Sequence, residues 1–285
     1  MCRKRKDGVR LKKCDPMLRM TSYIMPHRYD AQVFCEGKIK CENIDAFIKE
    51  EAEKGNRFRY MHIVIAGLVR MYAMRPKMNR FIMNRRIYSR NGITVCFTVK
   101  KTLQEDAPET TLKLKFTGKE SIYEIKEIID KAIEENKKIE DNNDTDKLMN
   151  SLLKLPNGFL KFVMKLIIWL DNRGLLPKKL IEASPFHTTL FLTNMKSLGS
   201  DYVYHHLYDF GTTSQFISMG KEHIEPYVEN DELTQKKIMK LGFNIDERIC
   251  DGFYYAKGIK IGTRFIENPA LMREPLENIV EDNGL

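Results

Sequence analysis

The residues best suited to chemistry lie in one stretch of the sequence, from Ser184 to Gly252. Segments 188–195 and 213–219 have the apolar character of buried strands, and between them comes a run rich in His, Tyr and small polar residues. The apolar run 238–245 then leads into a cluster of charged residues. Polar and titratable groups at the ends of strands often carry catalysis or binding. We therefore predict the functional site within this stretch.

The charged cluster contains Asp246, Glu247, Arg248 and Asp251. A carboxylate buried beside another carboxylate has a raised pKa, and it can then act as a general base. Arg248 would oppose this increase in the pKa of Glu247 if its side chain pointed the same way. An ion pair between Glu247 and Arg248, or another basic group, is the structural alternative. Cys250, inside the cluster, is interpreted as a small buried apolar residue rather than a nucleophile.

Four histidines are further candidates. His205 and His206 are adjacent, so in an extended segment only one of them would face a given pocket. His187 is a third candidate, whereas His27, after a proline, is expected at the surface. A histidine among tyrosines is more often packed and hydrogen-bonded than catalytic. No histidine spacing here matches a set of metal ligands, so we expect no metal.

The segments around this stretch must supply the sheet. Strands are expected at residues 32–39, 80–90, 93–101 and 110–116. Asn91 and Gly92 stand between two apolar runs and predict the turn of a β-hairpin.

Helices must position these strands. We expect helices at residues 43–55, 60–74, 121–138 and 253–266. Segment 60–74 is apolar around most of its circumference, which predicts a buried helix. Ser121 and Glu124 form a capping box at the start of their helix. Gly258 and Gly262 lie four residues apart, which predicts a close approach to a neighbouring backbone.

A helical insertion is expected at residues 148–176. Pro156 and Gly158 divide it, and Lys161 and Lys165 interrupt its second half. Its apolar run falls far short of the ~20 residues that span a bilayer. We expect an amphipathic helix packed on the domain or on a neighbouring subunit. The alternative is a helix that lies in the membrane interface.

Composition indicates a soluble globular protein. The 285 residues are 42% hydrophobic and 31% charged, and the net charge is +9. Much of this charge falls at the start of the chain, which predicts a solvated basic arm over residues 1–20, with attraction of a phosphorylated ligand as the alternative. Six irregularly spaced cysteines are expected to be reduced thiols in the cytoplasm. Nucleic-acid binding is not expected, because no basic stretch is interleaved with aromatic residues.

Three segments resemble the catalytic domain of the dihydrolipoamide acyltransferases of 2-oxo acid dehydrogenase complexes, and more distantly chloramphenicol acetyltransferase. The family motif D-H-R-x-x-D-G is similar to residues 246–252, its strand end F-T-x-S-N to 191–194, and its turn P-x-L-N to 76–79. The resemblance covers residues 23–268. One position departs from the family, because Glu247 stands where the family has its catalytic histidine.

The resemblance implies an α/β fold, a two-layer sandwich with a mixed β-sheet like that of chloramphenicol acetyltransferase. It implies one acyltransferase-like catalytic domain over residues 21–270, followed by a tail over 271–285. A homotrimer with active sites between subunits is expected. No lipoyl-attachment segment or small subunit-binding domain is recognised ahead of the domain, so we expect a free-standing relative.

The activity implied by the resemblance is the transfer of an acyl group from coenzyme A, as co-substrate, to a small-molecule acceptor. Residue by residue, Thr193 corresponds to the donor that stabilises the oxyanion, Asp251 to the supporting carboxylate and Glu247 to the base. His205 or His206 in place of the base is the alternative. The competing hypothesis is a catalytically silent relative that serves binding or assembly. Membrane association is not expected.

Overall fold

A computed structural model describes residues 5–100, 109–138 and 150–284. Its strands are β1 (Gly8–Arg10), β2 (Gln32–Lys40), β3 (Arg80–Met83), β4 (Arg86–Arg90), β5 (Ile93–Lys100), β6 (Glu109–Phe116), β7 (Leu190–Asn194), β8 (Gln215–Met219), β9 (His223–Glu229) and β10 (Glu232–Asp246). Its helices are α1 (Pro16–Ile24), α2 (Glu42–Glu53), α3 (Tyr60–Met74), α4 (Ile122–Lys138), α6 (Asn157–Asn172), α7 (Lys178–Ala183) and α8 (Gly252–Glu267), with short 3₁₀ turns that include η2 (Pro76–Asn79).

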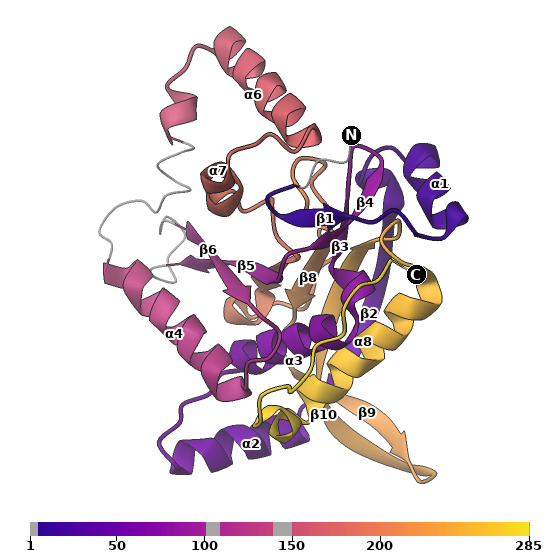
Figure 1. Cartoon of the computed structure of the whole chain (residues 1–285). Helices are drawn as coiled ribbons and strands as arrows, with labels where there is room; N and C mark the ends of the chain where they lie inside the picture. The colour runs from indigo at the N-terminus through magenta and orange to yellow at the C-terminus, as the bar shows by residue number, and fades with distance from the viewer. Residues whose placement is uncertain (1–4, 101–108, 139–149, 285) are drawn as a thin grey trace.

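The large sheet has the strand order β2-β10-β8-β7-β5-β6, and β9 pairs with β10 outside this path. Strand β7 is parallel to β5 and β8, whereas the other pairs are antiparallel, so the sheet is mixed. Helices α3, α4 and α8 pack together over one face of it (Figure 1). This arrangement confirms the predicted two-layer α/β sandwich.

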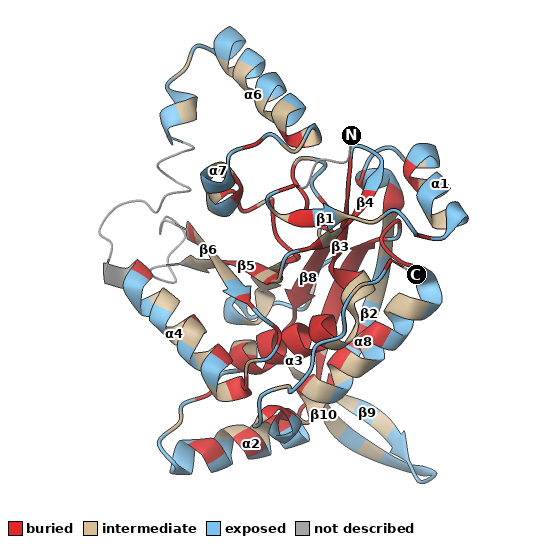
Figure 2. Cartoon of the chain, in the orientation of Figure 1, coloured by how far each residue is buried: buried red, intermediate tan, exposed pale blue. Residues whose placement is uncertain are grey.

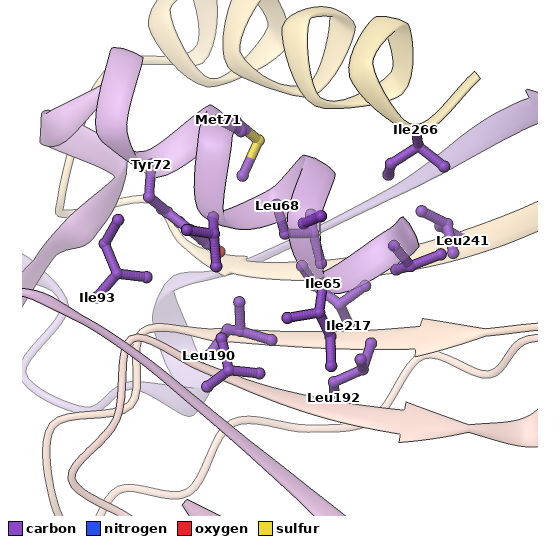
Figure 3. Packing of buried hydrophobic residues seen from close by; sticks show 14 of the residues in the cluster. Ile65, Leu68, Met71, Tyr72, Ile93, Leu190, Leu192, Ile217, Leu241 and Ile266 are labelled. Atoms are coloured by element: carbon purple, nitrogen blue, oxygen red, sulfur yellow. The ribbon is translucent and has the colours of Figure 1, made fainter. Parts of the chain in front are cut away.

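Helix α3 forms the centre of the core. Thirteen of its fifteen residues are buried, which confirms the prediction made from its apolar circumference. Ile65 and Leu68 point toward Leu192 and Ile217 of the sheet (Figure 3). The helix thereby fixes the strands whose ends carry the candidate site residues.

Helix α8 approaches α3 and η2 closely through glycines, as predicted. A Cβ atom at Gly258 would lie 2.0 Å from the Sδ atom of Met78, and one at Gly262 would lie 3.0 Å from the Sδ atom of Met71. Larger side chains would therefore push α8 away from its neighbours. The capping box at α4 is also confirmed, because the Ser121 N–H donates to a Glu124 carboxylate oxygen at 2.7 Å.

The predicted hairpin at Asn91 and Gly92 is wrong. Strand β4 belongs to a separate three-stranded sheet, β1-β4-β3, whereas β5 belongs to the large sheet, so this turn joins two sheets. The hairpin lies one strand earlier, between β3 and β4. Its central residues Asn84 and Arg85 have φ values of 48° and 57°, which are typical of a type I′ turn. The sequence did not predict this turn, because arginine is not a residue typical of a type I′ turn.

The predicted solvated arm is also wrong for its described residues. Main-chain pairing of β1 with β4 and the Asp15 cap of α1 build this segment into the fold. Arg5 is buried, and its guanidinium forms ion pairs with Asp7 at 2.8 Å and Asp171 at 2.6 Å. The basic composition favours a solvated arm, but the attraction of Arg5 to two buried carboxylates is stronger, because burial strengthens the attraction between opposite charges.

Helix α6 extends from the body of the molecule and leaves apolar side chains uncovered (Figures 1 and 2). Phe159, Phe162 and Trp169 on α6 are 53%, 61% and 46% exposed. An amphipathic helix is therefore confirmed, but packing of its apolar side on its own domain is wrong. No helix in the described part of the chain is long and apolar enough to cross a membrane.

Candidate functional site

The junction between β10 and α8 carries the charged cluster, and a buried ion network holds it. Asp246 is fully buried, and its two carboxylate oxygens accept hydrogen bonds from the Arg248 guanidinium at 2.8 and 2.7 Å. The Nε atom of Arg28 lies 3.5 Å from the same carboxylate. Burial acts to lower the pKa of Arg248, but the hydrogen bonds and charge of Asp246 raise it overall.

Arg28 links this network to three other parts of the chain. Its guanidinium donates to the main-chain oxygens of Tyr208, Ile82 and Gly211 at 2.7, 3.1 and 3.2 Å. Asp209 accepts the Arg28 N–H at 2.8 Å and contacts the His27 ring at 2.9 Å. The network is therefore a rigid base beneath the motif. His27 is half exposed, as predicted.

Glu247 is exposed at the end of β10. Its N–H donates to the Ala31 carbonyl at 2.9 Å, which fixes the main chain. In the part of the chain that the structure describes, no side chain hydrogen-bonds to or pairs with its carboxylate. The predicted ion pair with Arg248 is wrong, because Arg248 turns inward to Asp246.

Asp251 and Cys250 have structural surroundings. The Asp251 carboxylate caps α8 by accepting the Tyr254 N–H at 2.9 Å, and its side chain is exposed. Cys250 is buried, and burial raises the pKa of its thiol to about 12, so it is not a thiolate at neutral pH. This agrees with its interpretation as a buried apolar residue.

Thr193 lies near the end of β7, half-buried, on the face of the sheet opposite α3. Side chains alternate along a strand, and Leu190 and Leu192 point into the core, so Phe191 and Thr193 point the other way. We call this second surface of the large sheet the open face. Ser218 of β8 pairs in register with Thr193 and shares the open face.

The segment 201–208, which contains both candidate histidines, runs over the open face. The Val203 N–H donates to the Ser218 hydroxyl at 3.0 Å, and Asn244 donates from its amide to the His205 carbonyl at 2.6 Å. The His205 ring stacks on Phe216 with the ring centroids 3.9 Å apart. His205 is thus a packed histidine, whereas His206 beside it is exposed.

A single chain does not bring Glu247 and Thr193 together. Gly242 of β10 pairs with Ser218, which pairs with Thr193, so these three residues are level across the sheet. Glu247 follows Gly242 by five residues. At about 3.3 Å per residue, Glu247 lies about 17 Å further along the strands. Thr193 and His205 share the open face, whereas Glu247 and Asp251 lie beyond its edge.

His187 is buried in a polar cluster beneath the helical insertion. Its ring nitrogens contact the Ser184 hydroxyl at 2.8 Å and the Asp171 carboxylate at 3.0 Å. Asp171 also pairs with Arg5, and these partners lower the pKa of its carboxyl although burial acts to raise it. Ser184 is itself buried and accepts the Phe186 N–H at 3.3 Å. The cluster fastens α6 and α7 to the body of the protein.

The turn that resembles the family motif P-x-L-N is the 3₁₀ turn η2. Asn79 accepts a hydrogen bond from the Thr189 hydroxyl at 2.6 Å and donates to the Gly92 carbonyl at 2.9 Å. It therefore joins the start of β7 to the turn between the two sheets.

Sequence reasoning missed the buried cations Arg28 and Arg90, because their partners lie far away along the chain.

Comparison with known proteins gives matches in structure but not in sequence. No protein-family model matches the chain, and no curated protein sequence is similar to it. The dihydrolipoamide acetyltransferase of Azotobacter vinelandii is 10% identical, with 92% of this chain and 93% of that chain covered and a TM-score of 0.57. A probable dihydrolipoamide acetyltransferase of Listeria monocytogenes is 13% identical, with coverages of 90% and 94% and a TM-score of 0.54.

Chloramphenicol acetyltransferase is 11% identical, with 88% of this chain and 96% of that chain covered and a TM-score of 0.51. At such low identity these matches establish the fold. The chain has the chloramphenicol acetyltransferase-like fold that dihydrolipoamide acetyltransferase catalytic cores share, which confirms the resemblance of the three sequence segments at the level of the fold.

Proposed function

We propose that this protein is a coenzyme-A-dependent acyltransferase that acts as a homotrimer on a small-molecule acceptor. The observation that carries the proposal is the position of Glu247 and Thr193 on an acyltransferase fold. Both lie at accessible ends of strands of one sheet, yet about 17 Å apart along those strands in one chain. A site formed between two protomers would bring Glu247 of one chain to Thr193 of the next.

The proposed reaction transfers an acyl group from the coenzyme A sulfur to the acceptor. The Glu247 carboxylate takes the proton from the acceptor nucleophile as that atom attacks the thioester carbonyl. The Thr193 hydroxyl donates a hydrogen bond to the oxyanion that forms. The carbon–sulfur bond then breaks, and the proton passes to the departing coenzyme A thiolate. Packing of a second protomer over Glu247 would exclude water from the carboxylate and so make it a stronger base.

His205 is the alternative base, because it shares the open face with Thr193 in the same chain. Its stacking on Phe216 and its place in a hydrogen-bonded segment argue that it is a packing residue first. His206 is exposed beside it. Replacing His205 by Phe, which keeps the stacking, should leave turnover within about twofold of wild type if Glu247 is the base. A loss of more than about a hundredfold would assign the role to His205.

A catalytically silent relative is the second candidate. The exposure of Glu247 favours it, since a carboxylate surrounded by water is a weak base toward a thiol. Calorimetric titration with coenzyme A and acetyl-coenzyme A separates the two candidates. Micromolar binding supports the acyltransferase. Absence of binding to either compound would favour the silent relative.

The shared site makes a sharper test possible. Thr193→Val and Glu247→Gln should each reduce release of free thiol from acetyl-coenzyme A by at least about a hundredfold. Co-expression of the two variants should restore about a quarter of wild-type activity, because random mixing leaves one interface in four with both residues intact. If no activity returns while mixed trimers form, the two residues do not share a site.

A further inference from the structure

A cavity of about 220 Å³ lies on the open face, between α7, the residues just before β1, and strands β5 and β6 of the large sheet. Lys113 and Lys115 of β6 are two residues apart and point to the same side, opposite Leu112 and Leu114, which pack against the core. Five of the side chains around the cavity are cationic, against two carboxylates: Lys6, Arg90, Lys113, Lys115 and Lys178 face Asp7 and Glu182.

The acidic residues of the cavity do not balance this charge. Asp7 is paired with Arg5 at 2.8 Å, and Glu182 lies 3.5 Å from Lys178 on the same short helix. Across residues 5–100, 109–138 and 150–284, Lys115 has no ion-pair partner. The cavity is therefore a local concentration of positive charge rather than a balanced network.

Arg90 is a buried cation of the cavity with an unused donor. Its Nη1 and Nη2 atoms donate to the Thr212 hydroxyl at 3.1 Å and the Thr212 carbonyl at 2.6 Å, but its Nε atom has no partner among the described residues. Burial lowers the pKa of Arg90 to about 10; the charge of Asp7 opposes this change, and the charges of Arg5 and Arg28 add to it. A buried donor without an acceptor is destabilising, so an acceptor from a ligand would stabilise this site.

Lys113 is a second cation with capacity to bind. Its ammonium group donates to the carbonyls of Ile181 and Ser184, at 2.6 and 2.9 Å, and thus caps the end of α7. A lysine has three donors, so one remains. Burial, and next the charge of Arg90, lower the pKa of Lys113 to about 8. Two partly dehydrated cations face one small cavity, and a bound anion would relieve their repulsion.

We propose that this cavity binds the phosphate group of a small phosphorylated compound. Lys113 and Arg90 provide charge-assisted hydrogen bonds to the phosphate oxygens, and Lys115 at the rim adds attraction. The volume lies below the range of about 300–1,000 Å³ typical of sites that enclose drug-sized ligands, so it suits a phosphate and few further atoms. Thr94 lines the cavity, and its carbonyl accepts a hydrogen bond from the Thr189 N–H. Thr193 follows Thr189 by four residues, so it lies about 13 Å along the sheet from the cavity.

Calorimetric titration of the full chain with inorganic phosphate tests the proposal without any acyl donor or acceptor. Wild type should bind one phosphate per chain. Lys113→Met should weaken binding at least about tenfold, and Lys115→Gln about threefold. The matched control is Lys165→Gln on α6, which removes the same charge from an exposed position outside the cavity and should leave binding unchanged. No saturable binding, or an equal loss in the control, overturns the proposal.

Lys113→Met also removes the cap of α7 and could disturb folding. Thermal unfolding identifies such a failure, and Lys115→Gln, whose side chain is exposed, then decides the question. A second readout is the titration of the lysine ammonium groups by NMR. Bound phosphate should raise the pKa of Lys113 above its value in the free protein, and an unchanged pKa at saturation would contradict direct contact.

The phosphate could belong to a separate metabolite or to coenzyme A, which itself carries phosphates. Coenzyme A binding measured with and without saturating inorganic phosphate distinguishes these sources. A separate ligand predicts unchanged coenzyme A affinity, whereas competition identifies the cavity as a contact for a coenzyme A phosphate. Either result requires that the Lys115→Gln variant respond to phosphate more weakly than wild type.

Discussion

At the scale of single residues, the charged motif at the end of β10 depends on charges that the solvent does not reach. Asp246 holds Arg28 and Arg248 beneath the exposed Glu247. The exposed members of the motif have no comparable partners, since Asp251 caps a helix and Glu247 is held only through its main chain. The buried half of the motif thus fixes its geometry, and the exposed half faces the solvent.

Asp246→Asn should lower the free energy of unfolding by about 3–5 kcal/mol, because it leaves two buried guanidinium groups without their anion. Urea denaturation followed by circular dichroism measures this change. Asp251→Asn is the matched control, since asparagine caps a helix about as well as aspartate and should cost less than about 0.5 kcal/mol. Similar losses of stability in both variants would show that the ion pairs of Asp246 contribute no more than the cap at Asp251 does.

His62 predicts a pH dependence of stability. It is buried in α3, and burial lowers its pKa from 6.5 to about 4, although the charge of Asp130 opposes this. The unfolded chain therefore takes up the proton first. The stability contributed by neutral His62 is complete above pH 6.5 and is lost as the pH falls toward 4, by about 3 kcal/mol.

The measurement is the free energy of unfolding at several pH values from 7 down to 4, for wild type and for His62→Gln. Glutamine can still accept the Arg59 N–H that the His62 ring accepts at 3.2 Å. The variant should lose less stability over this range than wild type does. His206→Gln changes an exposed histidine on another part of the chain and should follow the wild-type curve. Parallel curves for wild type and His62→Gln would refute the assignment.

At the scale of elements, the position of the motif depends on how closely α8 can approach its neighbours. Gly258→Ala places a methyl group against the fully buried Met78 and should destabilise the protein by about 1–3 kcal/mol, even though alanine favours helix. Gly158→Ala on α6 meets no atom within 4 Å and should be neutral or stabilising. Thermal unfolding of the two variants and of wild type measures these differences in stability. A Gly258→Ala protein at least as stable as wild type would show that Met78 moves aside freely.

Elements with a strong local pattern could be predicted from sequence, and their partners could not. The all-round apolar pattern of residues 60–74 identified the buried helix α3, and the glycine spacing identified the close packing of α8. The Asn91-Gly92 pair predicts a hairpin because turn chemistry is local, whereas the choice of sheet for β4 and β5 depends on distant contacts. In the site, the same limit hid Arg28, whose partner Asp246 is far away in the sequence.

At the scale of the whole molecule, the proposed function requires assembly. The chain has a mass of 33.4 kDa, so a homotrimer should give a mass of about 100 kDa by size-exclusion chromatography with light scattering. The exposed apolar side of α6 would then be available to a neighbouring subunit. Flotation with anionic liposomes tests the membrane alternative for α6. A monomer at micromolar concentration would remove the basis for a site shared between chains.

Both ends of the described chain are fastened inside the body by arginine–aspartate pairs. Arg5 joins Asp171, and the Arg80 guanidinium forms two hydrogen bonds of 2.6 Å to Asp282, which lies 202 residues further along the chain. During synthesis on the ribosome, Arg80 therefore has no counter-charge until residue 282 has been added. The ion pair that fastens the start of β3 can form only after the chain has been made at least as far as Asp282.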